Sequence, residues 1–109
     1  MTVKELCSAA PLTVISLPDG EREINGVYIG DLLSWVMGRA QEDNAWITIM
    51  SNINVIAVAS LADTSCVILA EGVTLDDEVK TVAEQKGINV LTTEMPAYEC
   101  ALALSELLK

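Results

Sequence analysis

Histidine is absent from this sequence, and no segment completes a catalytic, metal-binding or phosphate-binding motif. Without histidine the chain lacks the commonest general base and the commonest metal ligand, and it has no Ser-His or Cys-His pair. The dinucleotide pattern G-x-G-x-x-G and the P-loop pattern G-x-x-x-x-G-K-[ST] are also missing. We therefore expect no catalytic residue, no metal and no cofactor.

Basic residues are scarce, because six Lys and Arg stand against sixteen Asp and Glu, which gives a formal net charge of -10. Nucleic acid and anionic lipid are bound by clustered Lys and Arg, so neither is expected as a partner. No apolar run reaches the roughly 18–20 residues that cross a bilayer. Residues 1–10 contain Lys4 and Glu5 and do not resemble a signal peptide. These features predict a cytoplasmic protein without a membrane partner.

Cysteines are few, and none stands in a C-x-x-C pair: they are Cys7, Cys66 and Cys100. An odd number of widely spaced cysteines is typical of reduced thiols in a reducing compartment. No His or basic cluster is placed to activate them. We expect all three to be packing residues.

Apolar residues, in contrast, are abundant: they make up 51% of the 109 residues, while charged residues make up 20%. A chain of this length forms one domain, here residues 1–109, and has much surface for its volume. The apolar excess is therefore hard to bury within one subunit. It favours a homodimer or a stable partner protein.

The hydrophobic pattern alternates between strands and helices from residue 45 onward. Strands are expected at 46–50, 66–70 and 88–91, and helices at 53–62, after the capping-box pattern Thr74–Asp77, and from Pro96 to about 108. The first forty residues predict a helix at 2–9, strands at 12–16 and 27–29, and a short helix that Asp31 caps and Gly38 closes. The fold class is α/β, a three-layer α/β/α arrangement with a mainly parallel sheet and a small mixed N-terminal segment.

The helix at 53–62 is apolar nearly all round, which indicates burial on two sides. One side would cover the sheet. The other side would meet either a helix of the same chain or a second subunit, and both alternatives remain open. For the second alternative the interface residues would be Val55, Ile56 and Ala59.

Ligands of parallel α/β sheets bind beyond the carboxyl ends of the strands, where helix N-termini offer free N–H groups. Polar or small residues follow three of the expected strands. The candidate ligand-binding residues are Ser51, Asn52, Asn54, Glu71, Gly72, Thr92 and Thr93. The alternative is ordinary helix capping, which accounts for Asn52 and Thr74. Because Glu71 and Glu94 are acidic and no Lys or Arg is near, a phosphate is disfavoured.

Several segments resemble the DRTGG domain family, over about Val27–Lys109. They are Gly30-Asp-Leu-Leu-Ser-Trp-Val-Met-Gly38, Trp46-Ile-Thr-Ile49, Asn54-Val-Ile-Ala-Val-Ala-Ser60, Leu69-Ala-Glu-Gly72 and Gly87-Ile-Asn-Val-Leu-Thr-Thr93. The resemblance implies a fold similar to the N-terminal domain of HPr kinase/phosphorylase and a dimerising regulatory role. The charged residues of the family's naming signature are absent at Ser51-Asn52-Ile53, and the kinase's phosphate-binding loop has no counterpart.

The function expected from these observations is a non-catalytic regulatory or interaction domain that is homodimeric and binds a small polar ligand at the strand ends. One alternative is a small enzyme that uses the carboxylates of Glu71 and Glu94 for acid/base work, which requires an enclosed cleft. Another is a subunit that docks on a larger partner enzyme.

Overall fold

The computed structural model describes the whole chain, residues 1–109. Five strands form one sheet in the order β1-β5-β4-β3-β2. The strands are β1 (Thr13–Ser16), β2 (Val27–Ile29), β3 (Ala45–Thr48), β4 (Cys66–Leu69) and β5 (Val90–Thr92), and the helices are α1 (Val3–Ala9), α2 (Leu33–Arg39), α3 (Ile53–Ala62), α4 (Asp77–Gln85) and α5 (Ala97–Leu107). None of the five helices is long and apolar enough to cross a membrane.

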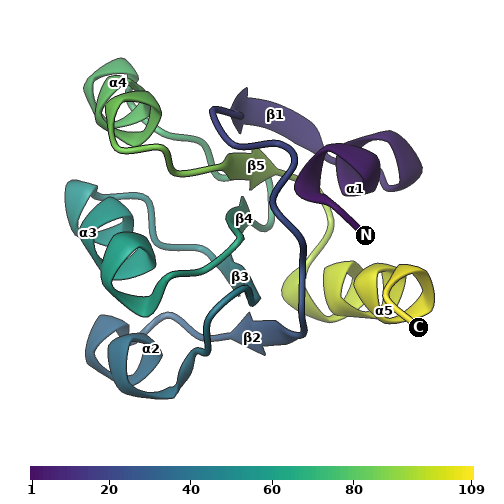
Figure 1. Cartoon of the computed structure of the whole chain (residues 1–109). Helices are drawn as coiled ribbons and strands as arrows, with labels where there is room; N and C mark the ends of the chain where they lie inside the picture. Colours follow the sequence, from purple (N-terminus) through teal and green to yellow (C-terminus); the bar gives the residue numbers. More distant parts are fainter.

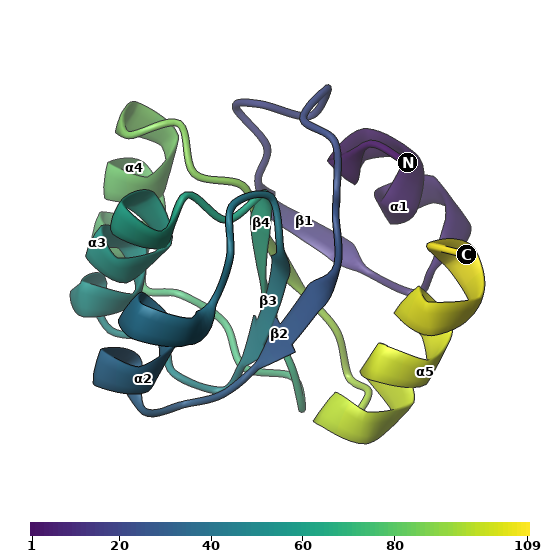
Figure 2. The same cartoon turned by 60° about the horizontal axis from the view of Figure 1, so that its bottom comes forward.

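The sheet lies between two layers of helices, with α2, α3 and α4 on one face and α1 and α5 on the other (Figures 1 and 2). Strands β2 to β5 are parallel and adjacent, so each connection is a βαβ unit. The exception is β1, which pairs antiparallel with β5 at the sheet edge, with Thr13 opposite Thr92. The predicted three-layer, mainly parallel α/β fold is confirmed.

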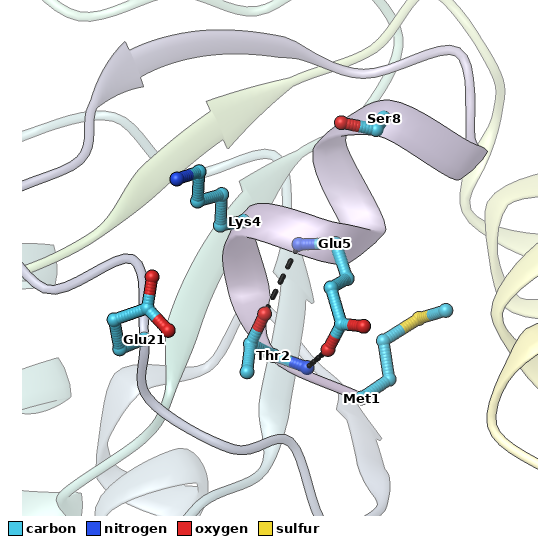
Figure 3. Close-up of a pocket in the computed structure, with 6 residues that line it drawn as sticks. All are labelled: Met1, Thr2, Lys4, Glu5, Ser8 and Glu21. Atoms are coloured by element: carbon cyan, nitrogen blue, oxygen red, sulfur yellow. Dashed lines mark hydrogen bonds between the residues drawn. The ribbon is translucent and has the colours of Figure 1, made fainter.

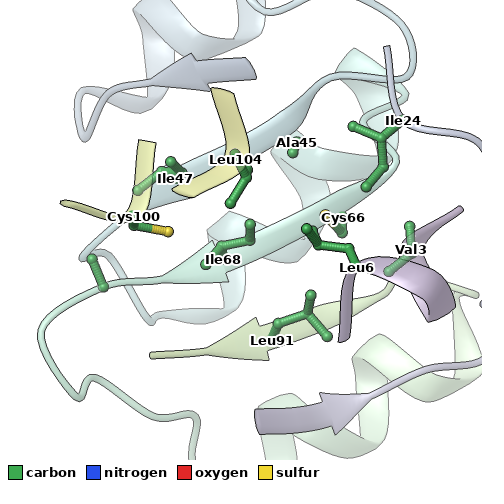
Figure 4. Packing of buried hydrophobic residues seen from close by; sticks show 11 residues of the cluster. Val3, Leu6, Ile24, Ala45, Ile47, Cys66, Ile68, Leu91, Cys100 and Leu104 are labelled. Atoms are coloured by element: carbon green, nitrogen blue, oxygen red, sulfur yellow. The ribbon is translucent and has the colours of Figure 1, made fainter. Parts of the chain in front are cut away.

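The two faces of the sheet carry separate hydrophobic cores. Strands β3 and β4 are buried along their whole length, because helices cover both of their faces. One core, shown in Figure 4, packs Ile47, Ile68 and Leu91 against α1 and α5. The other packs Trp46 and Val67 against α2, α3 and α4. Alternate residues of each strand thus enter opposite cores.

Helix ends differ from the sequence expectation at three positions: the start of α2, the end of α2 and the start of α4. The N-cap of α2 is Leu32, because the Asp31 carboxylate accepts hydrogen bonds from the Thr48 hydroxyl and the Ile49 N–H; α2 also continues past Gly38. The N-cap of α4 is Asp76, so the capping box expected at Thr74 does not form. A complete capping box does form in α1, between Thr2 and Glu5, at a position where none was expected.

Helix α3 has the bounds expected from the sequence, Ile53–Ala62, but the expected interface residues need correction. Val55, Ile56 and Ala59 are 0–1% exposed and belong to the core that the chain forms by itself. Side chains buried in this way are not available to a second copy. The exposed apolar residues of α3 are Ile53, Ala57 and Leu61.

The amino ends of the parallel strands are fastened by polar contacts. Arg22, in the loop between β1 and β2, donates to the Asp43 carboxylate at 2.9 Å and forms an ion pair with the Asp63 carboxylate at 2.8 Å. Burial acts to lower the pKa of Arg22, but the hydrogen bonds to both carboxylates outweigh it and the pKa is raised. The Asn89 side chain links Asp19 to Ser65 in the same region. These contacts hold together the loops at the amino ends of the parallel strands.

Candidate functional site

The three segments with candidate ligand residues follow β3, β4 and β5. These strands are neighbours and parallel, so the segments lie along one edge of the sheet, the carboxyl edge. The chain leaves β4 toward α4 on one face and leaves β5 toward α5 on the other face (Figures 1 and 2). In open α/β sheets, a divergence of this kind is where a ligand crevice forms. The expected residues around β4 and β5 stand at that point.

The segment after β3 leaves most of its polar groups at the surface. Asn52 is the N-cap of α3, and its side-chain oxygen accepts from the Asn54 N–H at 2.9 Å. Both side chains are exposed, and Ser51 is half-buried. Capping therefore uses one oxygen of this segment, while the amide groups of Asn52 and Asn54 face solvent.

The segment after β4 is fastened to the segment after β5. The Glu71 N–H donates to the Met95 carbonyl at 2.9 Å, and the Gly72 N–H donates to the Thr93 carbonyl at 2.8 Å. Both Glu71 and Gly72 have a left-handed backbone, with φ of 57° and 74°. A Cβ atom on Gly72 would stand 2.8 Å from a carboxylate oxygen of Glu94. Gly72 therefore permits this tight loop, but Glu94 covers it.

The two threonines at the end of β5 use their hydroxyl groups within the fold. The Thr92 hydroxyl donates to the Val73 carbonyl at 2.6 Å, and the Thr93 hydroxyl donates to the Pro11 carbonyl at 3.0 Å. Thr93 is also buried. These hydroxyls fix the loop after β4 and the loop before β1, so a ligand would meet the loops rather than the threonine side chains.

Asp31 belongs to this edge and was missed as a site residue in the sequence. Its carboxylate accepts from the Thr48 hydroxyl at 2.8 Å and from the Ile49 N–H at 3.0 Å, which ties the loop after β2 to the loop after β3. The available signal was an acidic residue directly after a strand. The same pattern is also typical of a helix N-cap, so the sequence alone does not distinguish the two roles.

The enzyme hypothesis required an enclosed carboxylate. Glu71 and Glu94 are both exposed, and no cleft encloses either of them. Among the thiols, Cys66 and Cys100 are buried, and burial raises the pKa of Cys66 to about 12 and that of Cys100 to about 11. These two thiols are therefore packing residues, as expected, whereas Cys7 is half-buried. The edge offers polar and acidic groups without an activated nucleophile.

The pocket that the surface does contain lies elsewhere, around the start of α1 (Figure 3). It is open, and its lining is Met1, Thr2, Lys4, Glu5, Ser8 and Glu21. Thr2 and Glu5 already bond to each other's backbone N–H groups in the capping box. The pocket adjoins the loop between β1 and β2, at the amino edge of the parallel strands, so it is separate from the candidate ligand residues.

Comparison with known proteins identifies a solved structure and a protein family that are similar to this chain. The chain is similar to a crystal structure of the CBS and DRTGG domains of the regulatory region of Clostridium perfringens pyrophosphatase, complexed with its activator diadenosine tetraphosphate. The TM-score is 0.74 at 14% sequence identity, and the match covers 94% of this chain and 45% of that chain. At this identity the likeness shows a shared fold, and the chain spans less than half the length of that neighbour.

No curated protein matches the chain. Similarity to the N-terminal domain of HPr kinase/phosphorylase stays a prediction. A family model, described as the DRTGG domain, matches residues 13–107, which is most of the chain and includes all five strands. The chain therefore belongs to the DRTGG domain family.

Proposed function

We propose that this chain is a non-catalytic regulatory domain that acts as a homodimer and binds a small polar ligand at the carboxyl edge. The observation that carries the proposal is its membership of the DRTGG family, together with a fold shared with the regulatory region of a pyrophosphatase. The divergence of the chain between β4 and β5 supports the location, because crevices form at such points.

Charge limits the class of ligand. Asp31, Glu71 and Glu94 all lie on the carboxyl edge, and its loops contain no Lys or Arg. A polyphosphate would meet these carboxylates without a compensating cation. The activator of the pyrophosphatase neighbour, diadenosine tetraphosphate, is therefore a poor candidate here. We propose a neutral or cationic polar ligand, held by loop N–H and C=O groups and by the Asn52 and Asn54 amides.

A thermal-shift screen tests this function with adenosine, ATP, diadenosine tetraphosphate, neutral amino acids and spermidine as probes. A ligand at 100 times its dissociation constant adds about 2.7 kcal/mol to the free energy of unfolding. For a domain of this size, that corresponds to a rise in Tm of roughly 10 °C or more. We expect neutral or cationic probes to raise Tm and diadenosine tetraphosphate to leave it unchanged.

Matched variants locate the site. Asn54→Ala and Glu71→Gln change exposed groups of the carboxyl edge, and Glu84→Gln changes an exposed carboxylate on α4 as the control. A probe that binds at this edge loses affinity in the first two variants and not in the control. Stabilisation by diadenosine tetraphosphate, or equal affinity in all variants, would contradict the proposed site.

A further inference from the structure

Strand β2 ends the sheet, and no other strand lies beyond it (Figure 1). The Ala45 N–H donates to the Gly26 carbonyl at 3.0 Å, and the Gly30 N–H donates to the Ile47 carbonyl at 3.2 Å. In a parallel pair, alternate residues of one strand bond to the same neighbour. The N–H and C=O groups of Val27 and Ile29 therefore point away from β3, with no partner strand.

The two edges of the sheet differ in how they resist pairing. Natural edge strands are protected by bulges, prolines or charged residues, most often lysine. The opposite edge strand, β1, has a register break between Val14 and Ser16. Strand β2 is Val-Tyr-Ile without a bulge, a proline or a charge, and Ile29 is 49% exposed. Its length of three residues limits how much it can pair, but no bulge, proline or charge blocks another strand.

Exposed apolar side chains flank β2 on both faces of the sheet. Figure 2 shows β2 between α2 and α5. Helical geometry and the right-handed β2–α2–β3 crossover turn Leu32 and Trp35 toward the free edge. On α5, which contacts β2 from the opposite face, Tyr98 and Leu102 are one turn apart. All four residues are exposed.

The segment from Gly26 to Gly38, which contains β2 and most of α2, is almost free of charge. Asp31 is the one charged residue between Gly26 and Gly38, and its carboxylate bonds inward to Thr48 and Ile49. A molecule with a net charge of -10 repels its own copies over most of its surface. Along β2 and α2, two copies can therefore meet with Asp31 as the one carboxylate that each copy contributes.

We propose that two copies of this chain pair antiparallel through β2 and form one continuous sheet, a mode of association that rests on the homodimer of the proposed function. With Tyr28 opposite Tyr28 on the two-fold axis, Val27 of each copy exchanges two backbone hydrogen bonds with Ile29 of the other. This symmetric register satisfies the free N–H and C=O groups of both strands.

The flanking helices fit the same arrangement. Leu33 and Val36 of α2 belong to the same hydrophobic core as Tyr28 of β2 and Trp46 of β3. The two-fold axis is perpendicular to the paired sheet, so it places the α2 helices of both copies on the same face. Because they run antiparallel, Arg39, which stacks on Trp35, comes alongside Asp31 of the other copy. The ends of the interface are thus complementary in charge.

Sedimentation velocity on matched edge variants tests the proposal. Ile29→Lys places a charge on β2, and Val14→Lys places the same charge on β1, where Val14 is 44% exposed. We expect the wild-type chain and Val14→Lys to be dimers. In Ile29→Lys, the dissociation constant should rise by about 100-fold or more, because the ammonium group would lie opposite Val27 of the other copy and lose hydration without a partner for its charge. Circular dichroism confirms that both variants are folded.

A second measurement does not depend on a variant. In the dimer, the amide hydrogens of Val27 and Ile29 are bonded and should exchange slowly, whereas in a monomer they face solvent and should exchange rapidly. Tyr28→Cys in a Cys7→Ser background should also form a disulfide across the axis under mild oxidation, while Val14→Cys in the same background should not.

The outcomes separate this proposal from the one on which it rests. A monomeric wild-type chain at 100 micromolar overturns both the paired edge and the homodimer. A dimer that survives Ile29→Lys, with rapid exchange at Val27 and Ile29, overturns the paired edge alone and transfers the interface to another surface, such as the Ile53–Leu61 face of α3. Ligand binding is measured independently of either result.

Discussion

At the scale of single residues, the buried thiols connect the core to the pH dependence of stability. Burial raises the pKa of Cys66 to about 12 and that of Cys100 to about 11, above the value near 8.5 of a thiol in an unfolded chain. Between these values the folded chain keeps both thiol protons and the unfolded chain loses them. The free energy of unfolding therefore has its full value below about pH 8.5 and falls as the pH rises toward 11.

We expect that fall to approach about 1.4 kcal/mol per pH unit for each thiol. Urea unfolding at pH 8, 9, 10 and 10.5 measures it, and Cys100→Ala provides the comparison, since it should shift the whole curve and reduce its slope by up to about 1.4 kcal/mol per pH unit. Equal slopes in the two proteins would contradict the assignment. Lysine and tyrosine titrations are common to both and cancel in the difference.

At the scale of elements, two similar capping-box patterns contribute differently to the free energy of unfolding. Thr2 and Glu5 form a complete capping box on α1, whereas Thr74 does not cap α4. We expect Thr2→Ala to lower the free energy of unfolding by about 1 kcal/mol. Thr74→Ala is the matched control, with an expected change within about 0.5 kcal/mol. Thermal unfolding of both variants measures the difference, and equal losses would contradict the cap assignment.

The elements also show how far the sequence alone can predict the fold. The alternation of strands and helices from residue 45 onward was predictable, because apolar strands and a helix such as Ile53–Ala62 have hydrophobic patterns that do not depend on distant residues. The position of β1 was not, since its antiparallel pairing with β5 joins residues far apart in the chain. The predicted cap at Asp31 was wrong because another partner competes for its carboxylate. The carboxylate accepts a hydrogen bond from the Thr48 hydroxyl rather than from the N-terminus of α2.

The sequence predicted where the candidate site lies, but not which of its side chains are free to bind a ligand. Strand order brings Ser51, Glu71 and Thr92 to one edge, as the pattern implied. No local sequence pattern indicates which of these groups are already occupied within the fold. The Thr92 hydroxyl donates a hydrogen bond to the Val73 carbonyl, and the Glu94 side chain covers Gly72. Such contacts depend on two loops that meet only after the sheet has formed.

At the scale of the whole molecule, the net charge of -10 opposes both folding and association. The molecule measures 32 × 25 × 24 Å. The Debye length is about 30 Å at 0.01 M salt and about 8 Å at 0.15 M, so repulsion acts across the whole molecule only at the lower concentration.

We therefore expect Tm to rise by several degrees when NaCl increases from 0.01 M to 0.15 M, and dimerisation to strengthen over the same range. Differential scanning calorimetry and sedimentation velocity measure the two effects. Sucrose at matched osmolality serves as the uncharged control and should give a much smaller change. A Tm that falls with added salt would mean that the few ion pairs, such as Arg22 with Asp43 and Asp63, outweigh the excess of negative charge.

The antiparallel pairing of β1 with β5 has a consequence for how the chain is made. Strand β1 is synthesised before the other four strands of the sheet, but it can join the sheet only when β5 has been synthesised, because its partners are Val90, Leu91 and Thr92. Until then, residues 13–16 remain exposed, while β2, β3 and β4 can already assemble with their helices. We expect a nascent chain that stops before residue 90 to be sensitive to proteases near its start and to become resistant once β5 has emerged.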